Sequence, residues 1–265
     1  MMGRYLGLLS RQLRTSALLA AQYRWDFVVD GVVSLFFMAT AIVPLFVVYG
    51  DSSRPGIPGW SFGEALVVTG WFILLQGVLD GAVNPGLQAV IDHIRKGTLD
   101  FVLLKPADAQ FLVSTARFQL WRVTSVVVAL VVFVAAFMRV GRAPAVLDVA
   151  ASLVLLVSAT LLLYSLWILI VSAAFFVVKV DNLTYLFSSI FDAARWPSSV
   201  FPNVLRFVFT FVVPLALMTT FPAEAMLGRL EPAALVGALL GTLVFAAVAR
   251  WTWLKAIGHY TSAGG

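Results

Sequence analysis

The feature that most constrains the fold is a run of 30 residues without a charged side chain, Val149–Val178. As one helix it would be about 45 Å long, enough to cross the hydrocarbon core of a bilayer and both headgroup layers. The whole chain of 265 residues is 61% apolar and 12% charged, whereas soluble domains are about half apolar and a quarter charged. One soluble core cannot bury that excess. The sequence therefore predicts an all-α integral membrane protein, a single domain over residues 1–265 with six transmembrane helices.

Hydropathy places five of the six spans directly. The second should end at Asn84-Pro85-Gly86, because proline and glycine do not readily continue a helix. A polar outer loop, 50–63, precedes that span, and a charged cytoplasmic segment, 85–119, follows it. An amphipathic stripe over residues 3–24 predicts a helix in the membrane interface, within an N-terminal interfacial segment 1–30. The five spans are Gly31–Tyr49, Glu64–Val83, Trp121–Met138, Val149–Val178 and Ala233–Trp251.

The sixth crossing falls in residues 183–229 and has two interpretations. Hydropathy alone favours a span at Phe207–Phe221 and an interfacial helix at Leu183–Trp196. Prolines 197, 202, 214 and 222 instead divide the region into pieces of about a dozen residues, since proline interrupts helices. A span at Leu183–Phe201, followed by two half-helices that dip back from the outside, is the alternative. Either interpretation crosses the bilayer once.

The distribution of Lys and Arg predicts the orientation. With the N-terminus inside and the hydropathy assignment, 14 of the 18 basic side chains are cytoplasmic. Twelve remain if Arg195 and Arg206 lie outside. Both counts predict a multi-pass protein of the plasma (inner) membrane with both termini in the cytosol. The net charge of +5 then indicates loops that face anionic lipid, with no nucleic acid as a partner.

The sequence lacks the residues that several kinds of functional site require. There is no cysteine, and His93 and His259 have no partner at metal-ligand spacing, so no metal site is expected. The phosphate-binding pattern Gly-x-x-x-x-Gly-Lys-Ser/Thr does not occur, so nucleotide energy must come from another chain. Spans one, three, four and six carry no Asp, Glu or His between their ends, which disfavours an ion-coupled carrier. The chain itself is not expected to be an enzyme or to contain catalytic residues.

Four polar residues are candidates for a substrate path. Asp80 and Asn84 share a helical face in the last turns of span two, and could line a path or simply be hydrated or paired with Arg122. Asp192 and Arg195 are spaced as an i,i+3 pair. If Leu183–Phe201 is a span, this pair lies inside the membrane and faces other helices; if not, it is a solvated face.

Ser158, Ser165 and Ser172 recur every seven residues along span four. Small polar stripes of this kind let helices approach closely and hydrogen-bond to one another. Helix packing is therefore the favoured role, ahead of lining a substrate path.

The cytoplasmic segment predicts a short helix, 98–105. Thr98 is a suitable N-cap after Gly97, Asp100 favours the first turn, and Pro106 ends the helix. Asp108 could cap the next helix, which would continue into span three. The short helix carries five apolar side chains in a charged loop, so either the membrane surface or a cytoplasmic partner should cover it. They are Leu99, Phe101, Val102, Leu103 and Leu104.

This segment resembles a known family. The runs Gly97-Thr98-Leu99-Asp100 and Leu103-Leu104-Lys105-Pro106 resemble the Gly-x-Leu-Asp-x-x-Leu-x-Lys/Arg-Pro segment of short six-span permease subunits of type-2 ATP-binding-cassette transporters. The prolines of 195–223 are similar to the region between spans five and six of the same family. The resemblance covers the whole chain.

The resemblance implies an exporter subunit. The helix 98–105 would be the coupling helix, and its ATPase-coupling residues would be Thr98, Leu99, Asp100, Phe101, Leu103, Leu104, Lys105 and Pro106. Residues 202–229 would form an outer re-entrant hairpin with Pro202, Pro214 and Pro222, which favours Leu183–Phe201 as span five. The pump would contain two cytoplasmic ATPase subunits, which hold ATP and magnesium, and a second permease, identical or related. This chain would hold no cofactor and contact membrane lipid. The alternative function is a membrane anchor or scaffold subunit without a transport path.

Overall fold

The computed structural model describes residues 2–22, 24–50, 56–176 and 181–260, and these residues form helices joined by short turns, with no strand among them. The predicted all-α class is confirmed. Residues 51–55 of the expected outer loop and 177–178 at the end of the expected fourth span lie outside the described residues.

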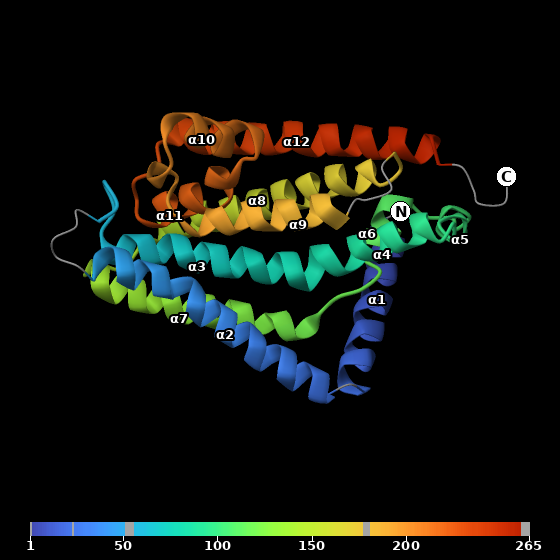
Figure 1. Ribbon diagram of the computed structural model, residues 1–265, viewed down its shortest axis with the longest axis horizontal. Helices are drawn as coiled ribbons and strands as arrows, with labels where there is room; N and C mark the ends of the chain where they lie inside the picture. The colour runs from blue at the N-terminus through green and yellow to red at the C-terminus, as the bar shows by residue number, and fades with distance from the viewer. Residues whose placement is uncertain (1, 23, 51–55, 177–180, 261–265) are drawn as a thin grey trace.

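In the part of the chain that the structure describes, five helices are long and apolar enough to cross a membrane. They lie side by side in one bundle (Figure 1). The expected spans one, three, four and six each coincide with one of these helices, with ends that differ by up to seven residues, and the described part of span four is a single undivided helix. The spans are Gly31–Tyr49 within α2 (Arg24–Tyr49), Phe62–Arg95, Leu120–Val140 with α7 (Val123–Val140), α8 (Val146–Ala173) and α12 (Pro232–Gly258).

The two ends of the bundle carry different elements (Figure 1). α1 (Met2–Gln22) begins and α12 ends at one of them, together with α4 (Asn84–Arg95), α5 (Asp100–Leu103) and α6 (Ala109–Ser114). We call this the α5 end. α1 leaves it at a steep angle to the bundle, the orientation expected of an interfacial helix. The opposite end, the α11 end, carries α10 (Asn203–Phe207), α11 (Phe221–Met226) and the start of α3 (Phe62–Val78).

The predicted end of span two at Asn84-Pro85-Gly86 is wrong. The helix continues from α3 through a π-helical turn, Leu79–Val83, directly into α4. Pro85 has no N–H, so the carbonyl of Gly81 loses its usual helical partner. The backbone N–H of Gln119 donates to that carbonyl instead, at 2.8 Å. A hydrogen bond from another part of the chain thus lets the helix pass through the proline.

Neither predicted span in residues 183–229 is one continuous helix, although α9 and the turn after it cover most of the helix expected at Leu183–Trp196. α9 (Asp181–Phe191) is followed by separate 3-10 turns, Asp192–Arg195 and Ser198–Val200, so Leu183–Phe201 is not one helix. The hydropathy alternative Phe207–Phe221 is broken at Val213–Leu215, around Pro214. Two half-helices, 203–212 and 216–226, meet there at 74°. The described residues therefore contain five helices long and apolar enough to cross a membrane, or six candidate spans if this bent pair counts as one.

A stripe of glycines sets the distance between α3 and α7, which pack along their whole length. Gly63, Gly70 and Gly77 recur every seven residues on α3 and face α7. A Cβ added at Gly70 would lie 2.6 Å from the ring of Phe133, and one at Gly77 would lie 2.4 Å from Cβ of Ser125. Any larger residue would push the helices apart, because small residues are what allow membrane helices to approach closely.

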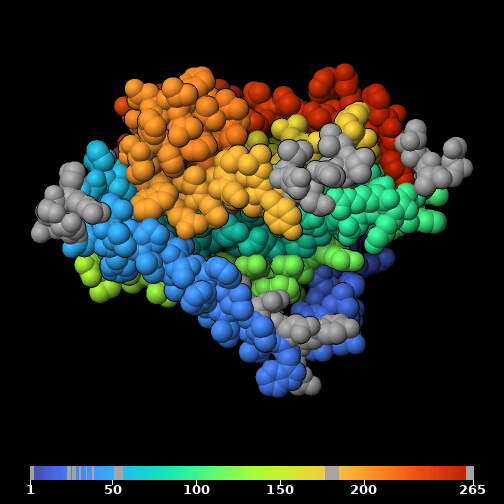
Figure 2. Space-filling model, viewed as in Figure 1, coloured from blue at the N-terminus to red at the C-terminus, as the bar shows by residue number. Residues whose placement is uncertain are grey.

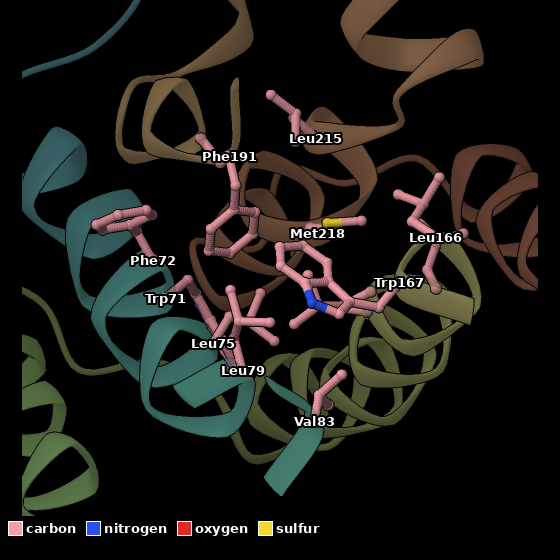
Figure 3. Packing of buried hydrophobic residues seen from close by; sticks show 14 of the residues in the cluster. Trp71, Phe72, Leu75, Leu79, Val83, Leu166, Trp167, Phe191, Leu215 and Met218 are labelled. Atoms are coloured by element: carbon pink, nitrogen blue, oxygen red, sulfur yellow. The ribbon is translucent and has the colours of Figure 1, made fainter. Parts of the chain in front are cut away.

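The core lies where α3, α8, α9 and the bent pair meet (Figure 3). Trp167 of α8 is almost fully buried, and its ring makes an edge-to-face contact with Phe187 of α9 at 4.6 Å between centroids. Phe191 packs on Phe72 of α3 at 5.5 Å. These aromatic contacts fix α9 and the following turns against α3, and that placement positions the cavity described below.

Candidate functional sites: an exposed loop helix and a charged cavity

The connection between α4 and α5 is a tight helix end built on Gly97. Gly97 has a φ of 63°, the left-handed conformation that favours glycine. The N–H of Gly97 donates to the carbonyl of Ile94 at 3.2 Å, and that of Thr98 donates to the carbonyl of His93 at 2.9 Å. These two hydrogen bonds satisfy carbonyls in the last turn of α4, and the chain turns sharply into α5.

The loop helix is shorter than predicted. α5 covers Asp100–Leu103 and its N-cap is Leu99, so the prediction of Thr98 as the N-cap of a helix 98–105 is wrong. The Thr98 hydroxyl lies 2.8 Å from Nδ1 of His93 instead. The backbone N–H of Thr98 is already used in the hydrogen bond that ends α4. This bond holds Thr98 where its side chain contacts α4 instead of capping α5.

The apolar side chains of this segment divide into two sets. Leu99 is fully buried and Val102 is 8% exposed, so these two fix α5 to the rest of the chain. Phe101 is 70% exposed and Leu104 is 81% exposed, three residues apart on the opposite face. We call Phe101 and Leu104 the exposed pair. Lys105 and Pro106 next to it are exposed as well.

Asp108 holds the next helix in place through two kinds of contact. As predicted, it is the N-cap of α6, and its Oδ1 accepts the N–H of Phe111 at 3.0 Å. Its carboxylate also accepts hydrogen bonds from both terminal nitrogens of Arg250 on α12, at 2.6 and 3.3 Å. Burial acts to raise the pKa of Asp108, but the hydrogen bonds from Arg250 and from the Phe111 backbone outweigh it and hold the pKa below its usual value. The carboxylate is therefore ionised at neutral pH.

The same network reaches α8. Arg250 donates to Oε1 of Gln110 at 2.7 Å, and Nε2 of Gln110 donates to the Tyr164 hydroxyl at 2.9 Å. The Ser114 hydroxyl is 2.7 Å from that of Tyr164. The expected helix from Asp108 into span three is not continuous, since α6 ends at Ser114 and helix resumes only at Leu120. α6 is thus a separate element bonded to two spans, α8 and α12.

α1 braces the same loop from the other side. The Tyr5 hydroxyl accepts the backbone N–H of Asp108 at 3.2 Å, and Arg4 donates to the carbonyl of Pro106. Gln12 accepts the Thr115 hydroxyl at 2.6 Å. The segment 106–115, which directly follows the exposed pair, is therefore held by α1, α8 and α12 together.

A cavity of about 610 Å³ lies between α2, α3 and the turns at 120–122 and 192–195. It contains two ion pairs. Asp80 and Arg122 are 3.1 Å apart, and Asp192 and Arg195 are 3.0 Å apart. Three of the four residues predicted to line a substrate path, Asp80, Asp192 and Arg195, thus line one cavity, and Asp80 makes the predicted pair with Arg122. The fourth, Asn84, is not among its lining residues and accepts the indole N–H of Trp167 at 3.3 Å.

The serine stripe lies away from this cavity. Ser158, Ser165 and Ser172 are buried, and the Ser158 hydroxyl is 2.6 Å from that of Thr242 on α12. The other two donate to carbonyls of their own helix. A role in packing α8 agrees with these contacts, and none of the three lines the cavity.

The three hairpin prolines occupy distinct positions. Pro202 is the N-cap of α10, Pro214 lies in the break between the half-helices, and Pro222 lies in the first turn of α11. Pro202 and Pro214 sit where a proline begins or breaks a helix, whereas Pro222 lies within the half-helix 216–226, where a π-helical turn passes into α11.

Sequence reasoning missed Arg250, Gln110 and Tyr164. Arg250 was visible only as one more basic residue at the end of span six, and nothing near it in sequence indicates its partner 142 residues away. Its one signal was position, since an arginine in the apolar last span needs a partner if it does not reach the interface.

The fold and these sites define a class of protein: a multi-pass α-helical membrane protein with an apolar pair exposed on a loop at one end of its bundle. A family model described as ABC-2 family transporter protein matches residues 35–264, and the chain belongs to this family of transporter membrane proteins. A search of the curated proteins and a search of the solved structures each find no match. The resemblance is confirmed for the family, while the short six-span branch and its Gly-x-Leu-Asp segment stay predictions.

Proposed function

We propose that the chain is the permease subunit of an ATP-binding-cassette exporter, powered by a separate cytoplasmic ATPase that docks on the exposed pair. The observation that carries this proposal is the exposure of Phe101 and Leu104 directly before a segment that three other helices hold. An apolar pair on a rigid support is suited to receive a mechanical displacement, and aromatic and aliphatic anchors of this kind dominate protein interfaces. The family supports the partner, since its members are membrane subunits of ATP-driven transporters.

The proposed assembly contains two permeases, identical or related, and two ATPase subunits that bind ATP and magnesium. The α5 end then faces the cytosol with both termini, and the membrane is the plasma membrane. The bent pair 203–226 at the opposite end is the outer re-entrant hairpin, and α9 with its following turns makes the fifth crossing. The choice of α9 is supported by its course along the bundle toward the α11 end, where both half-helices gather (Figure 1).

The test is retention of the ATPase on the tagged permease after Phe101→Ala with Leu104→Ala. Each anchor should contribute on the order of 2 kcal/mol, so the double variant should weaken ATPase binding about 100-fold or more if the two effects roughly add. Asp100→Ala should do less, because it removes only a favourable first-turn charge. Membrane yield should not change, since the exposed pair makes little contact with the rest of the chain.

The matched control is Val146→Ala with Leu147→Ala. These side chains are as exposed as the exposed pair, at 88% and 79%, but lie at the start of α8, away from the α5 end. The control should retain the ATPase fully. Equal retention by both double variants would contradict docking at α5 and would favour a scaffold or a coupling surface elsewhere.

A further inference from the structure

The two ion pairs of the cavity lie at different depths along α3. Arg195 places its guanidinium 5.3 Å from the centre of the Phe72 ring, at the level of the Asp192 pair. Asp80 is eight residues further along the same helix, which corresponds to about 12 Å. Gln76, between these levels, donates to Asp80 at 2.9 Å. The two ion pairs therefore line the cavity at successive levels of α3.

The charges of the cavity balance. Its lining contains two carboxylates, from Asp80 and Asp192, and two guanidinium groups, from Arg122 and Arg195. A ligand with a single net charge would be repelled by one member of each pair as strongly as it is attracted by the other. A headgroup that carries both a positive and a negative charge can be matched to both members.

One wall of the cavity is apolar and open. α2 contributes Val33 and Phe37, which are exposed although they line the cavity, and α2 packs weakly against the bundle. In Figure 2 the atoms of α3 lie set back between those of α2 and those of α9. A hydrocarbon tail could lie along this wall and continue into the lipid while the headgroup stays among the ion pairs. The volume is within the range of small-molecule sites, which is roughly 300–1,000 Å³.

We infer that the cavity binds a zwitterionic amphiphile, with the headgroup between the Asp80–Arg122 and Asp192–Arg195 pairs and the tail along α2. The inference names a substrate class for the proposed permease and in that sense rests on the proposed function. Binding itself needs only this chain, so it can be measured without the ATPase.

The chain has no cysteine, so a single cysteine can report occupancy. Thr40→Cys places a thiol on the α2 wall of the cavity. The variant is purified in dodecyl maltoside, and its reaction with a maleimide is timed with dodecylphosphocholine as the zwitterionic probe. The comparison probes are dodecyltrimethylammonium, dodecyl sulfate at low mole fraction, and glycerophosphocholine, which has the headgroup without a tail. Ala143→Cys, on the exposed loop after α7, is the control thiol.

Dodecylphosphocholine should slow the reaction at position 40 at least about fivefold, as expected for a ligand that occupies the site most of the time. It should leave position 143 unchanged. The singly charged amphiphiles and the tail-free headgroup should protect position 40 less at the same concentration. Equal protection by all three amphiphiles would overturn the inference, because it would reflect micelle composition rather than recognition of charge. No protection by any of them would overturn it as well.

Charge variants give a second, independent test. Asp192→Asn leaves the cavity with one excess positive charge and should shift the preference toward dodecyl sulfate by about fivefold, the scale of a partly exposed charge contact. Arg195→Gln should shift it toward dodecyltrimethylammonium. The double variant restores neutrality and should restore the zwitterion preference. Asp192 is 57% exposed, so Asp192→Asn should leave the elution profile of the protein normal, and the same profile is the check that the Arg195 variants are folded.

An unchanged preference in both single variants would refute the assignment of the headgroup to this pair. Failure here together with normal ATPase retention would leave the permease proposal standing with a different ligand. If the cavity binds the zwitterion but no ATPase copurifies with the chain, the ligand assignment would stand and the permease proposal would fail.

Discussion

The contacts of Asp108 predict that its two roles can be separated by substitution. Asp108→Asn keeps a side-chain oxygen to cap α6, because Asn is as good an N-cap as Asp, but removes the charge that pairs with Arg250. Asp108→Ala removes both the cap and the ion pair. The difference between the two variants is then the contribution of the cap.

The ion pair is partly exposed, with side-chain exposures of 33% for Asp108 and 43% for Arg250. Solvent screening therefore limits it to about 1 kcal/mol, the upper part of the range for exposed pairs. Loss of the N-cap should cost about 1 kcal/mol more. Local opening of α6 should thus become about 5-fold more frequent in Asp108→Asn and about 30-fold more frequent in Asp108→Ala.

Amide hydrogen exchange of the α6 peptide, residues 109–114, measures this opening in the detergent-solubilised protein. Asp92→Ala, an exposed acid on neighbouring α4, serves as the control and should leave α6 unchanged. Equal exchange in Asp108→Asn and Asp108→Ala would show that the cap contributes nothing. No acceleration in either variant would mean that α1 and the Gln110–Tyr164 bond hold α6 without Asp108, and the reasoning on this network would fail.

Three further predictions concern pH and topology. Because the pKa of Asp108 is held below its usual value, its stabilisation is present at neutral pH and is lost progressively as the pH falls from the usual carboxyl pKa, about 4, through the lowered pKa of the folded state. The difference in exchange between wild type and Asp108→Asn should therefore shrink over that range. In intact cells an impermeant thiol reagent should label Ala143→Cys and spare Ala107→Cys, and the opposite result would invert the proposed orientation. Asn203→Cys and Gly228→Cys should both be labelled from outside if the bent pair is re-entrant; protection of Asn203→Cys until the cells are permeabilised would make the pair a crossing.

The long apolar helices could be predicted because membrane crossing is a local property of sequence. α2, α7, α8 and α12 each satisfy a length and polarity requirement within a single stretch. The continuation of α3 through Pro85 could not be predicted in this way. It depends on Gln119, 38 residues beyond the Gly81 carbonyl whose partner it replaces, and local rules for proline have no access to such a contact.

The candidate sites show the same division. The capping role of Asp108 follows from its position before a helical pattern, but its pairing with Arg250 requires the folded bundle. Likewise Asp192 and Arg195 were recognisable as an i,i+3 pair. That they face the same cavity as Asp80 and Arg122 depends on how α9 and the turn after it pack against Phe72.

Two seven-residue stripes show why a pattern of small residues does not by itself identify its partner. The serines of α8 attract attention because they are polar in an apolar helix. Yet of the three, Ser158 bonds to Thr242 of α12, while Ser165 and Ser172 donate to carbonyls within α8. The glycines of α3 carry no polar atom and are easily passed over in a hydrophobic span. They nevertheless allow a close approach to α7, since a methyl group at Gly77 would collide with Ser125 of that helix. In lipid no hydrophobic force selects one apolar face over another, so the face that permits backbone approach decides which helices pair. The absence of a side chain was therefore the stronger signal for α3, and the close α3–α7 contact it allows places Arg122, at the start of α7, beside Asp80.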